Sequence, residues 1–206
     1  MTPKTPAGNL EIRTFSAREL RVAPVEGGAG RLVGYAAEFN SLSEDMGGWF
    51  ERIAPGAFAE AIARDDIRCL RDHEEYMILG RNKAGTLTLA EDDRGLAIDC
   101  AMPDVSYARD LAVSIERGDV NQMSFAFAVE DAADERWERI GDQVVRTLLK
   151  VKLYDVSAVT FPAYPSTSVG LRSFERFRSE QATPPAPTGR STQLLARELD
   201  LITAGS

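Results

Sequence analysis

The chain has 206 residues, a length that suits one domain of ordinary size with an appended tail. An apolar fraction of 44% and a charged fraction of 27% predict a packed core. The formal net charge of −8 disfavours binding to nucleic-acid phosphates. No run approaches the roughly 18 apolar residues that span a bilayer, and the N-terminus lacks the apolar stretch of a signal peptide. We therefore expect a cytoplasmic protein with neither nucleic acid nor membrane as a partner.

The first half of the chain reads mainly as strands. Residues 1–10 are predicted to form a flexible arm without periodicity. LEIRTF (10–15) and RLVGYAAEFN (31–40) predict an opening hairpin that turns through the glycine-rich EGGAG. APGAFAEAIAR (54–64) is typical of a short helix, with proline in its first turn. IRCLRDH (67–73) predicts a short strand that ends at the histidine.

The second half alternates hairpins with one clear helix. GTLTLAEDD (85–93) and GLAIDCAMP (95–103) predict a hairpin. Residues 103–120 predict a helix, with an apolar stripe at helical spacing and a glycine where a C-terminal cap belongs. QMSFAFAVE (122–130) reads as a strand. Residues 137–161 read as a hairpin whose second strand is long.

The C-terminal part changes in character. SFERFRSEQATPPAPTGRST (173–192) is polar and proline-bearing and predicts a linker or disordered tail, followed by a short amphipathic helix at 192–202. The predicted organisation is an N-terminal arm (1–10), one folded domain (11–172) and a flexible tail (173–206). Many strands with two modest helices predict an α+β fold, built mainly on an antiparallel β-barrel or closed sheet.

Ser124 stands out within its predicted strand. Successive strand residues point to opposite faces, so Met123, Phe125 and Phe127 belong to a core face and Ser124 lies on the other. Only small side chains share the face of Ser124, which leaves room for a bound chain. The residue is therefore either a small polar residue on a wet surface or a nucleophile.

Asp155 interrupts the more apolar face of the last strand. A carboxylate turned toward a core is costly unless it is paired. Two kinds of partner are available. One is an arginine salt bridge with Arg68, Arg71 or Arg81, and the other is the N–H of His73.

His73 is the sole histidine of the chain, so any imidazole chemistry must use it. Its alternative interpretation is a partly exposed residue without a special role. A serine nucleophile needs a base, and that base needs a third group that fixes its tautomer. His73, Ser124 and Asp155 could supply these three groups, because triads occur in different chain orders on unrelated folds.

The two cysteines do not indicate a functional site. Cys69 and Cys100 are too few for a disulfide framework and lack the spacing of a zinc site. Both are expected to be small core residues, and neither a metal nor a cofactor is expected.

Five segments, in order, resemble a known family. They are GYAAEFNSLS (34–43), ERIAPGAFAEAI (51–62), DHEEYMILGR (72–81), SYARDLAVSIERGDVNQMSFAF (106–127) and LYDVSAVTFPAYPSTSV (153–169). Together they resemble the tailed-phage (caudovirus) prohead proteases, which are capsid-maturation serine proteases related to the herpesvirus assemblins. The resemblance implies a fold like that of the herpesvirus proteases, with a few helices flanking the barrel.

The resemblance also implies residue roles. Ser124 would be the nucleophile, His73 the base and Asp155 the acidic third member. Two positions depart from the family pattern, which often has glycine where Ala126 stands and glutamate where Asp155 stands. Arg81 is a candidate for oxyanion or substrate support, although a surface or salt-bridging arginine is the favoured interpretation.

The implied function is maturation of a phage prohead. The substrates would be the capsid scaffold, or a scaffold-like extension of the major capsid protein, and also the enzyme's own tail. The reaction would take place in the host bacterial cytoplasm, inside the assembling procapsid. Relatives suggest a homodimer, the tail could tether the enzyme to scaffold, and an exposed edge strand near Ser124 could bind substrate by strand addition.

Two other functions stay open. A small-molecule serine hydrolase would share the three residues, but the GxSxG elbow of the common hydrolase fold is missing. A non-catalytic capsid assembly factor would keep the fold without the chemistry.

Overall fold

The computed structural model describes residues 10–16, 19–25, 28–161 and 168–182. The chain divides into two compact units, residues 1–172 and 173–206. The strands are β1 (Glu11–Ser16), β2 (Arg21–Ala23), β3 (Arg31–Glu38), β4 (Phe50–Ile53), β5 (Arg68–Arg71), β6 (Ile78–Arg81), β7 (Leu87–Glu91), β8 (Gly95–Ala101), β9 (Gln122–Ala128), β10 (Glu135–Ile140), β11 (Gln143–Leu148) and β12 (Lys152–Val159). The helices are α1 (Ala59–Arg64), α2 (Ser106–Glu116) and α3 (Ser168–Ala182), with short 3-10 turns at Asn82–Ala84 and Ala132–Asp134.

The largest sheet has the strand order β1-β9-β12-β5-β6. Within it, β9 runs antiparallel to both β1 and β12, whereas β12 and β5 are parallel. The two edge strands of this sheet are β1 and β6. Strand β9 is therefore an interior strand, and its residues 122–127 pair with both β1 and β12.

A second sheet, of order β2-β3-β8-β7, shares a hydrophobic core with the first. Met123, Phe125 and Phe127 on β9 are fully buried in this core, which confirms the predicted core face of that strand. Leu32 on β3 and Leu111 on α2 complete the same core from other elements. The predicted helix and the predicted β7–β8 hairpin are also confirmed.

The third sheet, of order β10-β11-β4, is linked to β1 by a buried group of charged side chains. We name this group the ion cluster, and it comprises Glu11, Arg13, Glu51, Glu135 and Arg146. Arg13 donates to both carboxylate oxygens of Glu51, at 2.6 and 3.0 Å. Arg146 donates to both oxygens of Glu11 at 2.8 Å and to Glu135 at 2.5 Å.

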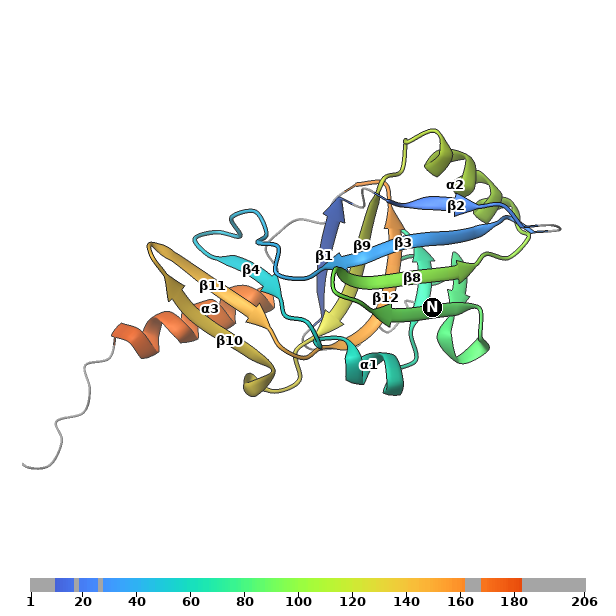
Figure 1. Ribbon diagram of the computed structural model, residues 1–206. Helices are drawn as coiled ribbons and strands as arrows, with labels where there is room; N and C mark the ends of the chain where they lie inside the picture. Colours follow the sequence, from blue (N-terminus) through green and yellow to red (C-terminus); the bar gives the residue numbers. More distant parts are fainter. Residues whose placement is uncertain (1–9, 17–18, 26–27, 162–167, 183–206) are drawn as a thin grey trace, which may run out of the picture. The chain divides into compact units, whose positions relative to one another are not determined.

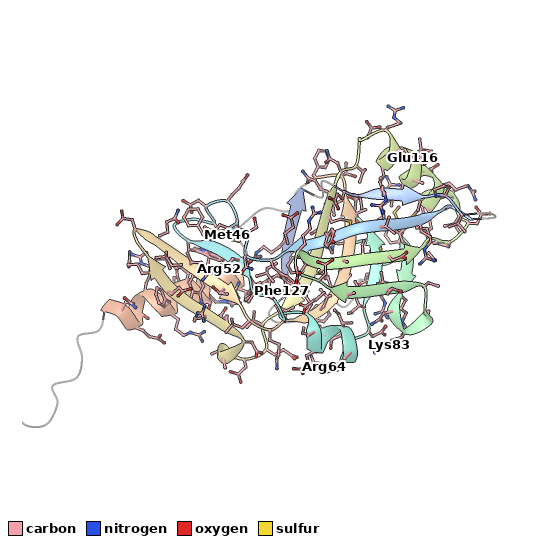
Figure 2. All side chains as sticks on the ribbon, in the orientation of Figure 1. Met46, Arg52, Arg64, Lys83, Glu116 and Phe127 are labelled. Atoms are coloured by element: carbon pink, nitrogen blue, oxygen red, sulfur yellow. The ribbon has the colours of Figure 1, made fainter. Side chains whose placement is uncertain are left out.

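The electrostatics of the ion cluster favour its charged state. Burial alone would raise the pKa of Glu11, but the hydrogen bonds and positive charges of Arg146 and Arg13 outweigh burial and hold that pKa below its usual value. The Arg13 guanidinium also lies over the ring of Phe127, 5.4 Å from its centre. Figure 2 shows Phe127 where β4 meets the strands of the largest sheet.

Two predictions of strand connectivity were wrong or incomplete. The opening hairpin was wrong, because β1 pairs with β9 and it is β2 that forms a hairpin with β3. The long strand of the last hairpin is two strands, β11 and β12, in different sheets. At the break, the N–H groups of Leu149 and Lys150 donate to the carbonyl of Asp134, which replaces the lost ladder bonds.

The α+β prediction is confirmed. Among the described residues, the strand ladders form three separate sheets and close no barrel. Figure 1 shows β9 lying between β1 and β12 in the largest of them. The barrel therefore stays a prediction.

The predicted linker begins as a helix. Residues 173–182 belong to α3, where the sequence predicted polar, aperiodic chain. The overlooked signal is that Gly170, Phe174 and Phe177 recur at i, i+4 and i+7, a helical period. Phe174 is buried and Phe177 half-buried.

Several predictions fall outside the described residues. They concern residues 1–9 of the arm and residues 183–206 of the tail, including the predicted helix at 192–202. Within the described part of the chain, no helix combines the length and the apolar character needed to cross a bilayer.

Candidate active site

Ser124 lies in the middle of β9, directly between two neighbouring strands. Its register partner on β1 is Thr14, and its partner on β12 is Ser157. Residues paired across an antiparallel ladder point to the same face. The three hydroxyl side chains therefore form a row across the sheet, on the face opposite Phe125. All of Ser124 is buried, with an exposed fraction of 0%.

A β-bulge in β12 turns Asp155 toward this row. Before the bulge Leu153 pairs with Phe127, and after it Asp155 pairs with Ala126, so Tyr154 is the extra residue. Without the extra residue, Asp155 would lie on the core face. The prediction that Asp155 shares the apolar face of Leu153 was therefore wrong, because a bulge re-aims the side chains that follow it.

His73 is presented by a tight turn that follows β5. Asp72 and His73 both adopt left-handed backbone conformations, with φ of 52° and 59°. Such conformations are costly for residues other than glycine and need support from their surroundings. The support comes from β12 and its end. The Asp72 N–H donates to the carbonyl of Ala158 at 2.9 Å, and the Asp72 carboxylate accepts the N–H of Thr160 at 2.7 Å.

The structure brings the three predicted site residues together. His73 Nδ1 lies 2.7 Å from Asp155 Oδ1, and His73 Nε2 lies 2.8 Å from Ser124 Oγ. A carboxylate can only accept at Nδ1, so this nitrogen carries the hydrogen. Nε2 is then an acceptor for the Ser124 hydroxyl. The arrangement lets imidazole take a proton from Ser124 while Asp155 holds the ring.

Strand β1 contacts the other side of Ser124. The Ser124 hydroxyl lies 2.8 Å from the backbone carbonyl of Arg13, to which it can donate, and the Thr14 hydroxyl donates to Ser124 Oγ at 3.3 Å. A hydroxyl has one hydrogen. His73 Nε2 and the Arg13 carbonyl therefore compete for the same proton.

The arginines offered as partners for Asp155 bond elsewhere. Arg68 and Arg81 pair with Asp66, and Arg71 pairs with Asp72. Arg81 donates twice to Asp66, at 2.6 Å each, and this contact lowers the pKa of Asp66 to about 2. Of the two interpretations of Arg81, the structure therefore matches the salt-bridging one.

Ser157 was missed by the sequence analysis. Its hydroxyl donates to Asp155 Oδ1 at 2.7 Å, and its exposed fraction is 0%. A hydroxyl two residues after a strand carboxylate shares its face, so the spacing in DVS was a usable signal. Thr14 had no such signal, since its place depends on the pairing of β1 with β9.

Cys69 and Cys100 are both fully buried core residues with free thiols, as predicted. A hydrogen bond between the thiols of Cys69 and Cys100, together with burial, raises the pKa of Cys69 well above its usual value. Such thiols are poor nucleophiles. In the described ranges, no group of three or more histidine, cysteine and acidic side chains is arranged to hold a metal ion.

Comparison with known proteins gives a matching family and similar solved structures. A family model described as caudovirus prohead serine protease matches residues 18–180. The solved structure of the bacteriophage T4 capsid assembly protease, gp21, is similar with a TM-score of 0.48 and 10% identity, over 75% of this chain and 98% of that one. No curated protein matches the sequence.

Proposed function

Because the chain belongs to the family of caudovirus prohead serine proteases, we propose that its serine protease activity is carried by Ser124, His73 and Asp155. The observation that supports these roles is the continuous chain of hydrogen bonds through His73, with 2.7 Å on one side of the ring and 2.8 Å on the other. Each side chain comes from a different segment, so the alignment is a property of the folded sheet.

The proposed reaction is acyl transfer. Ser124 Oγ bonds to the carbonyl carbon of a peptide, and its proton passes to His73 Nε2. Asp155 accepts the Nδ1–H and stabilises the imidazolium. The C–N bond then breaks, and His73 protonates the leaving amine. Water repeats the sequence on the acyl-enzyme and restores the Ser124 hydroxyl.

The proposed substrates are capsid proteins. The family description supports a protease of the prohead, so we assign it the scaffold, or a scaffold-like extension of the major capsid protein, as its target. Cleavage would take place in the bacterial cytoplasm within the assembling procapsid. Self-cleavage in the tail after residue 173 and a homodimer are further parts of this proposal.

Substrate access is limited by the sheet. Ser124 is fully buried and lies on an interior strand, so a peptide cannot add to β9 while β1 is in place. Of the two edges of the five-stranded sheet, β1 is the one beside β9. If substrate binds by strand addition near Ser124, β1 is therefore the strand involved, and the groups that cover Ser124 must move.

The test compares wild type with Ser124→Ala, each co-expressed with the neighbouring capsid and scaffold genes, by intact-mass spectrometry. We expect wild type to trim scaffold or capsid protein and itself, and the variant to leave all of them at full length. The matched control is Ser114→Ala on α2, whose hydroxyl donates to the Asp110 carbonyl within the same helix.

Other outcomes separate the alternatives. Equal, uncut masses for wild type and Ser124→Ala in assembled shells would contradict the protease proposal and favour an assembly factor. Turnover of small esters by the purified protein, without cleavage of scaffold, would favour a small-molecule hydrolase.

A further inference from the structure

The third member of the proposed triad has a second donor. Asp155 Oδ1 accepts from His73 Nδ1 at 2.7 Å and from the Ser157 hydroxyl, also at 2.7 Å. Both donors converge on the same oxygen atom. Ser157 Oγ itself lies 3.3 Å from His73 Nδ1. Ser157 thus contacts both the carboxylate and the imidazole that the carboxylate orients.

The bulge of β12 places Asp155 and Ser157 on the face of the sheet that carries Ser124. After the extra residue Tyr154, Asp155 and Ser157 point to the same face, and Ser157 lies directly opposite Ser124. The hydroxyl is wholly buried, so water does not compete for it. A buried hydroxyl needs a hydrogen-bond partner, and Asp155 is the acceptor at the shortest distance.

The geometry restricts both the carboxylate and the ring. A carboxylate held by one donor can rotate about its terminal torsion, which has a broad energy profile. A second donor on the same oxygen limits that rotation. Ser157 uses its single hydrogen on Asp155, so its oxygen can only accept at Nδ1. Both acceptors near Nδ1 therefore favour the tautomer in which this nitrogen carries the hydrogen.

We propose that Ser157 is a positioning residue, which fixes Asp155 Oδ1 and holds His73 in the Nδ1–H tautomer that accepts the Ser124 proton. This inference rests on the proposed function, since it gives Ser157 a part in the same reaction. Ser157 touches neither the peptide nor the bonds that change. It acts through Asp155 and His73.

The test uses the purified full chain and a fluorophosphonate probe, which needs no knowledge of the natural substrate. In this reaction Ser124 Oγ bonds to phosphorus, fluoride leaves, and His73 takes the hydroxyl proton. For Ser157→Ala we expect the maximal labelling rate to fall about ten-fold, because a hydrogen bond to a charged group is lost, while the half-saturating probe concentration stays unchanged. Ser157→Thr, which keeps a hydroxyl, should restore most of the rate.

A spectroscopic measurement tests the position of the hydrogen directly. His73 is the only histidine, so the imidazole ¹⁵N signals need no assignment by mutation. In a Ser124→Ala background, which removes self-cleavage, we expect the Nδ1–H tautomer to dominate with Ser157 present. Adding Ser157→Ala should give a mixture of tautomers, a change that a purely structural residue would not cause.

The outcomes distinguish this inference from the proposed function. If Ser157→Ala labels at the wild-type rate and keeps a single tautomer, the positioning of His73 by Ser157 is wrong while the protease stands. If Ser124→Ala is labelled as fast as wild type, the nucleophile assignment fails. The tautomer measurement then still decides what Ser157 does to His73. Ser114→Ala is the control for the loss of a hydroxyl outside the site.

Discussion

Two clusters of polar side chains lie on opposite faces of strand β1, and they are built differently. The ion cluster joins charged side chains of β1 to the three-stranded sheet. The other group, which we name the site cluster, joins hydroxyls, one imidazole and one carboxylate, and it comprises Thr14, His73, Ser124, Asp155 and Ser157. In the ion cluster, carboxylates and guanidinium groups satisfy one another. In the site cluster, two hydrogen-bond acceptors compete for the hydroxyl proton of Ser124.

Strand β1 shows how the two groups are kept apart. Glu11 and Arg13 pair with Phe127 and Phe125 and so face the ion cluster, whereas Thr14 faces Ser124. Only the backbone carbonyl of Arg13 reaches the site. Alternation along one strand therefore separates residues that hold sheets together from residues that can move a proton. Substitutions in the ion cluster should therefore leave the labelling rate largely unchanged, and substitutions in the site cluster should leave the stability largely unchanged.

The largest effect is expected within the site cluster, from Asp155→Asn. The amide no longer favours the Nδ1–H tautomer, and comparable changes in other triads lower the rate by about 10⁴-fold. The thermal midpoint should change little, because the side-chain volume is kept. The measurement is the fluorophosphonate labelling rate beside a melting curve. Asp66→Asn, an exposed carboxylate paired with arginines, is the control and should label at the wild-type rate.

The next effect concerns stability alone. Arg146→Met removes one buried cation from Glu11, Glu51 and Glu135, and breaking a buried ion pair costs about 3–5 kcal/mol. Urea unfolding measures this loss. The labelling rate per folded molecule should stay near wild type. Equal stability of the variant would show that the ion cluster contributes no net stabilisation. Arg117→Met, with its exposed fraction of 70%, is the control.

A pH dependence should follow from Glu11. Its pKa in the folded chain lies below its usual value, because Arg146 and Arg13 outweigh the opposing effect of burial. The Glu11 carboxyl group therefore has a higher pKa in the unfolded chain than in the folded one. Its contribution to stability is complete above the pKa of the unfolded chain and is lost as pH falls through the pKa of the folded chain. As pH is lowered from about 7 to about 3, the unfolding free energy of wild type should fall toward that of Glu11→Gln. A constant difference would contradict this, and Glu116→Gln on the surface is the control (Figure 2).

The smallest effect is expected in the turn that carries His73. Asp72→Ala removes the acceptor for Thr160 and places alanine at a positive φ. Asp72→Gly removes the same acceptor but tolerates that backbone. The Asp72→Ala variant should therefore be less stable than the Asp72→Gly variant by about 1 kcal/mol. Both variants should be labelled only a few-fold more slowly than wild type. Equal stability of the two variants would show that hydrogen bonding, rather than backbone strain, dominates the turn.

Local patterns along the chain predicted much of the site. The alternation in QMSFAF gave the core face of β9 and left Ser124 on the other face, as the structure has it. The sole histidine and an isolated strand carboxylate made His73 a candidate partner of Asp155, beside three arginines. These signals are readable because residue type and strand parity act over a few residues.

Long-range pairing decided the rest. The pairing of β1 with β9 brings residues about 110 positions apart together, and a turn signal near β1 pointed to another partner. The extra residue Tyr154 places Asp155 on the opposite face of the sheet. The sequence of β12 alone does not predict this bulge, because a bulge is defined only relative to the neighbouring strand. By itself, the sequence therefore identified the candidate residues for the proposed chemistry. The tertiary structure decided which side they face and what they contact, because register is a relation between strands.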